Sequence, residues 1–272
     1  MLAGPGPAGL NLPQIDRPSP RRAEQRNWLS LDIPLPPSRF RACLDAVQTD
    51  PRAAETTARS WLADAGKSGL SATAQPNLCL GYALAAQQKW LPAEQALSKA
   101  RAAATSDVLL RAQAGGMAGN AALAGGATER ALGLLDAAHA DAVTAGRPVL
   151  AASITLDRVR ALVALGRKDE AESALADARA TLPDDPQAWL LSATLARRMD
   201  KLADAQKFIE NAVNIAPRDG DIGVEAGVIA MLAGHEDAAR KSWQSVLETA
   251  SDSEAGKRAS FYLGQLSPPP KQ

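Results

Sequence analysis

The chain has 272 residues with 30 basic and 30 acidic side chains, so its formal net charge at pH 7 is zero. This balance excludes an overall electrostatic attraction to nucleic acid or to anionic lipid. Aromatic residues make up only 4% while alanine is abundant, and no segment alternates β-branched with polar residues, which favours closely packed helices over strands. No run of about 18 apolar residues occurs, so a membrane-spanning helix is not expected.

The first part of the chain, residues 1–37, contains eight of the 18 prolines and is expected to be an extended tail. It begins MLAGPGPAGLNLP, which lacks the basic n-region of a complete signal peptide but also matches the small-residue end of a longer one. The expected location is therefore cytoplasmic as written, or periplasmic if a signal peptide was omitted upstream. A strongly apolar strip, NWLSLDIPLP at 27–36, either packs over the open end of the first helical pair or lies in the groove of the helical domain as an internal pseudo-ligand.

Helical patterns begin at about Ser38. A first helix is expected from Ser38 to Gln48, and Asp50 followed by Pro51 then provides a cap and a proline at the first position of a second helix, about Pro51 to Ala65. Five further helix pairs follow along the chain. Ser251 with Glu254 fits a capping box that opens a last helix ending near Leu266, and a last helix with one polar face would close the exposed end of a stack.

An apolar stripe recurs in the second helix of each pair from the second pair onward. Its leading position is alanine each time, with gaps of 38, 40, 34 and 34 residues: Ala93, Ala131, Ala171, Ala205 and Ala239. The position four residues later is bulky: Leu97, Leu135, Leu175, Ile209 and Trp243. One such stripe is ordinary for an amphipathic helix, but its recurrence near a period of 34 residues predicts a repeat architecture.

These features resemble the tetratricopeptide repeat (TPR) family. The residues that carry the resemblance are clearest at 186–218, namely Trp189, Ala205, Ala212 and Pro217. Gly81, Gly119 and Gly227 match the helix-crossing glycine of the family, and Gly126, Gly166 and Gly234 match its turn glycine. The sequence departs from the family at Val159 and Ala193, in the crossing position, and at Asp200, in the turn.

The resemblance implies an all-α fold, a right-handed α-solenoid of about six TPR-like helix pairs with a C-terminal capping helix. The expected organisation is a proline-rich extended tail at 1–37, a repeat domain at 38–266 with its clearest repeats at 74–251, and a tail at 267–272. The wide spacings among the early repeats imply longer helices or loops near 143–148.

Few residues suggest catalysis. No Walker loop, HExxH motif or nucleophile elbow occurs, and His139 and His235 have no partners at metal-ligand spacing. The chain is therefore predicted not to be an enzyme and to need no cofactor or metal. Four tryptophans are predicted to lie in the core rather than to stack on a ligand: Trp61, Trp90, Trp189 and Trp243.

Cys43 and Cys79 fall midway along the first helices of two neighbouring pairs. Two interpretations stay open. They are either free buried thiols, which behave as small hydrophobic side chains, or the two halves of a disulfide formed in an oxidising compartment.

In TPR proteins the first helices of successive pairs line a concave groove. Transferred to this sequence, the resemblance implies a groove lined by Tyr82, Asn120, Asp157, Arg160, Gln187, Thr194, Arg197, Arg198 and Glu225. Its arginines suit an acidic or carboxylate-bearing partner. The alternative is a solvated charged face in which the arginines pair internally with Asp157 and Glu225.

The predicted function is a non-catalytic scaffold that binds a protein or peptide in this groove during the assembly or regulation of a complex, with no nucleic-acid partner. The alternative is a structural or oligomerisation module that uses its convex face or its end caps.

Overall fold

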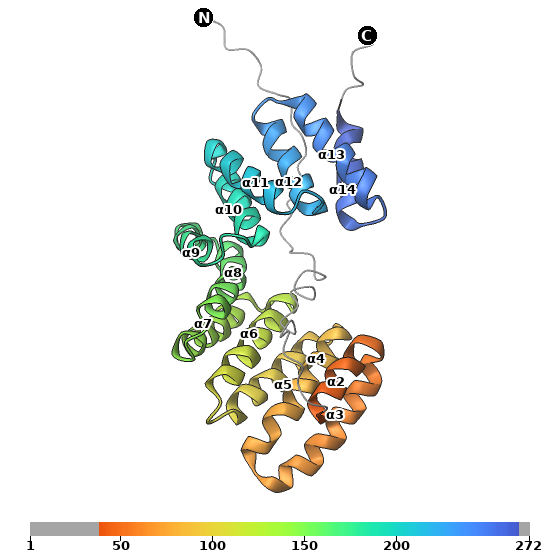
Figure 1. The fold of residues 1–272 in the computed structure, drawn as a ribbon, viewed down its shortest axis with the longest axis vertical. Coiled ribbons are helices and arrows are strands. Elements are labelled where there is room, and N and C mark those ends of the chain that lie inside the picture. Colours follow the sequence, from red (N-terminus) through yellow and green to blue (C-terminus); the bar gives the residue numbers. More distant parts are fainter. Residues whose placement is uncertain (1–37, 267–272) are drawn as a thin grey trace, which may run out of the picture. The chain divides into compact units, whose positions relative to one another are not determined.

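In a computed structural model, the described residues 38–266 form two compact units, residues 38–182 and residues 183–266, and each unit is treated by itself (Figure 1). All regular structure in these residues is helical. Both predicted tails lie outside the described residues, and so does the apolar strip at 27–36.

The first unit consists of four helix pairs joined by short turns. In chain order they are α2 (Arg39–Thr49) with α3 (Pro51–Ala65), α4 (Ala74–Ala86) with α5 (Trp90–Ala103), α6 (Val108–Ala124) with α7 (Thr128–Thr144), and α8 (Pro148–Ala164) with α9 (Lys168–Thr181). Two short 3-10 helices, Gly66–Ser68 and Leu70–Thr73, link α3 to α4.

The second unit consists of two pairs and a final helix. These are α10 (Pro186–Arg198) with α11 (Leu202–Ile215), α12 (Gly220–Leu232) with α13 (Glu236–Ala250), and α14 (Glu254–Gln265). The predicted all-α helical-repeat solenoid is therefore confirmed, with the helix pairs where the sequence pattern expected them.

Side-chain caps fix several of the helix starts. Ser38 Oγ accepts a hydrogen bond from the Arg41 amide at 3.1 Å, and Asp50 Oδ1 accepts from the amides of the first turn of α3. The predicted capping box at Ser251 is wrong. Ser251 has helical backbone angles at the end of α13, whereas Ser253 has the extended conformation of an N-cap and its Oγ accepts from the Gly256 amide at 3.0 Å.

The recurring apolar stripe forms the core between the two helices of each pair. Its alanines and its bulky residues are all buried. At Gly81, Gly119 and Gly227 an added Cβ would overlap the bulky stripe residue of the partner helix, Leu97, Leu135 and Trp243 respectively. These glycines are therefore required by the close approach of two helices.

Helix length explains the irregular repeat spacing. Helices α6, α7 and α8 have 17 residues each, whereas α10 has 13 and α11 has 14. The wide gaps of 38 and 40 residues thus arise where the helices are longest.

Within each unit the backbones of consecutive first helices approach one another closely, whereas those of consecutive second helices lie farther apart. The contacting series are α2, α4, α6 and α8 in the first unit, and α10, α12 and α14 in the second. We call the side of each unit formed by these helices the inner face, and the side formed by α3, α5, α7, α9, α11 and α13 the outer face.

The prediction that four tryptophans lie in the core is fully confirmed for one of them. Trp243 is 1% exposed, and its indole N–H donates to the Val224 carbonyl at 3.1 Å. Trp61 and Trp189 are half-buried side chains packed against core clusters, and Trp90 is also half-buried.

The two cysteines are joined by a disulfide. Cys43 on α2 and Cys79 on α4 are both buried, with their Cα atoms 6.1 Å apart. The bridge connects the first helices of the first two pairs, so the structure corresponds to the bridged interpretation and not to free thiols.

Candidate peptide-binding face

The residues predicted to line a groove lie on the first helices of the pairs, so they belong to the two inner faces. Tyr82 on α4, Asn120 on α6, and Asp157 and Arg160 on α8 belong to the first unit. The residues of the second unit are Gln187, Thr194, Arg197 and Arg198 on α10 and Glu225 on α12.

A polar cluster joins α6 to α8 in the first unit. Asn120 Nδ2 donates to Asp157 Oδ2 at 2.9 Å, and the Arg160 guanidinium donates to the other oxygen of the same carboxylate. Asn120 and Asp157 are only 7% and 2% exposed, while the Arg160 side chain is 14% exposed. A buried carboxylate requires such partners, so the cluster fixes the relative position of the two helices.

Tyr82 lies on the helix that precedes this cluster. Part of its surface is exposed, and its ring packs against the core of the first unit. Burial raises the pKa of its hydroxyl group to about 12. The hydroxyl therefore stays protonated at neutral pH and can donate a hydrogen bond.

An ion pair joins the two first helices of the second unit. Arg197 Nε and Nη2 donate to the two carboxylate oxygens of Glu225, at 2.6 and 3.2 Å. Both side chains are largely buried, with 13% and 8% exposed. Gln187, Thr194 and Arg198 are half-buried on α10.

The structure therefore contains the internal pairs of the alternative interpretation. Arg160 pairs with Asp157, and Arg197 pairs with Glu225.

Sequence reasoning missed a second set of charged side chains that link successive helices. Asp141 on α7 accepts from Arg101 Nη2 on α5 at 2.6 Å and from Arg111 on α6 at 3.0 Å. Arg130 on α7 donates to Glu94 on α5 at 2.7 Å. The sequence contains a signal for these pairs, namely oppositely charged residues spaced by about one repeat. Arg101 and Asp141 are 40 residues apart, and Glu94 and Arg130 are 36 residues apart.

The histidines lie apart from these networks. His139 is half-buried on α7, where burial and the charge of Arg158 lower its pKa, and His235 is exposed at the start of α13. Among residues 38–266, no group of three or more His, Cys, Asp or Glu side chains is placed to hold a metal ion. None of the described helices is long and apolar enough to cross a bilayer.

Comparison with known proteins supports the repeat assignment. Residues 152–195, which run from α8 into α10, match the family model described as tetratricopeptide repeat. No curated protein sequence matches the chain at a significant level.

Several solved structures share the fold. The pilF protein of Pseudomonas aeruginosa has a TM-score of 0.64 at 13% identity and covers 82% of this chain and 96% of its own. PilW, described as a widely conserved type IV pilus biogenesis factor, has a TM-score of 0.64 at 17% identity, covering 80% of this chain and 95% of its own. TTC0263, a thermophilic TPR protein of Thermus thermophilus, has a TM-score of 0.54 at 20% identity, covering 70% and 98%.

The family match and the shared fold confirm the resemblance that the sequence indicated: the chain is similar to tetratricopeptide-repeat proteins and has their helical-repeat fold.

Proposed function

We propose that the chain is a non-catalytic scaffold that binds a segment of a partner protein on the inner face of its first unit, in the assembly or regulation of a complex. The observation that carries the proposal is the side-by-side contact of α4, α6 and α8, which places Tyr82, the buried Asn120 and Arg160 on three successive first helices. A surface made by adjacent rigid helices recognises an extended segment through shape and a few anchoring polar groups.

The partner chemistry follows from the charges on this face. Arg160 pairs with the buried Asp157, so the cluster carries no large positive field. An acidic or carboxylate-bearing partner stays a prediction, and it requires Arg160 to donate to two carboxylates at once. Binding to such a partner weakens as salt is added.

The test compares two arginines of the same helix. Arg160 belongs to the inner-face cluster, whereas Arg158 donates to Asp136 on α7 at 2.6 Å, in the outer layer. Both Arg160→Gln and Arg158→Gln remove one positive charge from α8 and leave one aspartate without its arginine. We expect Arg160→Gln to reduce capture of partners from the native organism at least ten-fold and Arg158→Gln to leave it unchanged.

The outcome is measured by affinity capture with quantitative mass spectrometry, after circular dichroism has shown that both variants are folded. Equal capture by the two variants would contradict binding at the inner face. Self-association of the wild type without any captured partner would instead support the oligomerisation module.

A further inference from the structure

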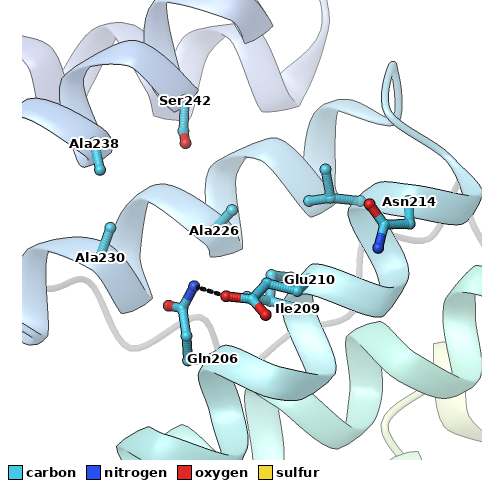
Figure 2. Close-up of a pocket in the computed structure, with 9 residues that line it drawn as sticks. Gln206, Ile209, Glu210, Asn214, Ala226, Ala230, Ala238 and Ser242 are labelled. Carbon is cyan, nitrogen blue, oxygen red and sulfur yellow. Dashed lines mark hydrogen bonds between the residues drawn. The ribbon is translucent and has the colours of Figure 1, made fainter.

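A hollow lies between α11 and α13 in the second unit, and residues of α12 also line it. Its volume is about 380 Å³, within the range of about 300–1,000 Å³ that is usual for ligand sites. Figure 2 shows Ala226 and Ala230 of α12 beside the hollow, with Gln206, Glu210 and Asn214 projecting from α11 and Ser242 from α13. The lining thus combines small apolar groups with a polar edge that contains one acid.

The repeat register gives this hollow a counterpart in the first unit. Glu210 stands five residues after the stripe alanine Ala205, as Asp136 does after Ala131. On the facing first helix, Ala226 stands one residue before the crossing position Gly227, as Arg158 does before Val159. The pair Glu210 and Ala226 therefore corresponds to the pair Asp136 and Arg158.

The two positions differ in how the acid is satisfied. Arg158 Nε donates to Asp136 Oδ1 at 2.6 Å. Alanine at position 226 has no donor, and among the described residues Glu210 accepts only from Gln206 Nε2, at 2.7 Å (Figure 2). Glu210 is exposed, so its charge is available at the edge of the hollow.

The remaining facing pair within one unit is different again. Its residues are Ser98 and Ala118, and neither is an acid. A hollow also adjoins Asp136 between α7 and the turn that joins α8 to α9, but that acid already has its arginine. Among the three facing pairs at the stripe helices α5, α7 and α11, each within one unit, an acid opposite a small neutral residue therefore occurs once, at Glu210.

We propose that the hollow between α11 and α13 receives an arginine side chain from a segment of a partner protein, which takes the place that Arg158 has in the first unit. The guanidinium group donates to the Glu210 carboxylate, with Asn214 and Ser242 as further acceptors. The methylene groups of the arginine lie over Ala226 and Ala230, because a long charged side chain covers apolar surface with its stem. A guanidinium suits a carboxylate better than an ammonium does, since its planar fork donates two parallel hydrogen bonds.

This site lies on the outer layer and does not depend on binding at the inner face of the first unit. The experiment titrates the ¹⁵N-labelled full chain with the capped tripeptide Ala-Arg-Ala, and with the same tripeptide carrying citrulline, which keeps the shape but not the charge. Saturable chemical-shift changes are expected at Gln206, Glu210 and Ala226 with the arginine peptide only.

Two variants and a matched control complete the test. Glu210→Gln removes the acid, and Ala226→Arg supplies the arginine from α12 itself; each should weaken the binding of the arginine peptide at least ten-fold. Asp136→Asn removes the acid at the corresponding position of the first unit and should leave binding unchanged.

The proposal is overturned if the arginine peptide gives no saturable shifts at these residues, if citrulline gives the same response, or if both variants bind as the wild type does. Binding of free arginine without binding of the capped peptide would also overturn it, because that result assigns the hollow to a small molecule. Glu210→Gln keeps the test valid if Ala226→Arg does not fold, since Glu210 is exposed.

Discussion

In the first unit, successive repeats are joined by a disulfide and by several ion pairs, whereas the second unit combines ion pairs such as Arg197–Glu225 with aromatic packing. The links of the first unit include the Cys43–Cys79 disulfide and the ion pairs of Glu94 and Asp141. In the second unit, Trp243 stacks on Tyr262 with 5.0 Å between the ring centroids. Trp189 lies beside Phe208, with 6.1 Å between their ring centroids. The same helix-pair plan is thus stabilised by two different sets of side chains, which the following predictions separate.

The largest effect is expected in the second unit. Trp243 is buried at the point where α12 crosses α13 and also contacts α14 through Tyr262. Trp243→Ala leaves a cavity at this point and removes the hydrogen bond to Val224, so a loss of about 3–5 kcal/mol is expected. Urea denaturation measures this loss of stability. Hydrogen exchange shows where in the chain it occurs, and exchange in α2 to α5 should not change. Uniform loss of protection in both units would show that they do not respond independently.

The next-largest loss of stability is expected in the first unit, on removal of the disulfide. The disulfide closes a loop across 36 residues of sequence separation, and loops of this size give about 2–4 kcal/mol of stability. The double variant Cys43→Ala with Cys79→Ala should therefore lose this amount and increase hydrogen exchange in α2 and α3, with α10 to α13 unchanged.

A thiol titration provides the control for the disulfide. Unreduced protein, denatured after isolation from native cells, should show no free thiol, as expected of a bridge that persists in an oxidising environment. Two free thiols per chain would show that the bridge does not form there.

A smaller effect is expected from adding volume to the second unit. Ala205 begins the stripe of α11 and is fully buried. Ala205→Leu forces additional methyl groups between α10 and α11 and should cost about 1–3 kcal/mol. Ala203→Leu, on an exposed position of the same helix, is the matched control and should be nearly neutral. An unchanged urea midpoint for Ala205→Leu would contradict the tight packing of this pair.

The helices themselves could be predicted because their signals are local. Asp50 followed by Pro51 fixed the start of α3, and the alanine-led stripe gave each second helix its buried side. Ser251 misled because it and Ser253 are equally good capping residues, and only the path of the chain after α13 decides between them.

The side-chain partners between repeats could not be predicted with the same certainty. A periodic stripe says which side of a helix is buried, but not how far each repeat turns relative to the one before. That turn decides whether Asn120 reaches Asp157, and whether Cys43 reaches Cys79. The hollow beside Glu210 depends on a side chain that Ala226 lacks, so it becomes visible only when the repeats are compared with each other.

The smallest predicted effect tests the charged pairs of the first unit by pH. Glu55 on α3 accepts hydrogen bonds from Lys89 at 2.9 Å and from Arg59 at 2.7 Å, and these hold its pKa at about 2, below the ordinary value of 4.5. A lowered pKa in the folded state means that the carboxylate stabilises the fold above pH 4.5, and that this contribution is lost as the pH falls from 4.5 towards 2.

The Lys89 and Arg59 side chains are 47% and 58% exposed, so screening by solvent limits each pair to about 0.2–1 kcal/mol. Glu55→Gln should remove this part of the pH dependence from the first unit and leave the second unit unaffected. Urea midpoints recorded between pH 2 and 7 measure the difference, with exchange in α12 and α13 as the internal reference. If the variant and the wild type lose stability in parallel over this range, the Glu55 carboxylate does not contribute to holding α3 against the following pair, and the disulfide and apolar packing hold the first two pairs together.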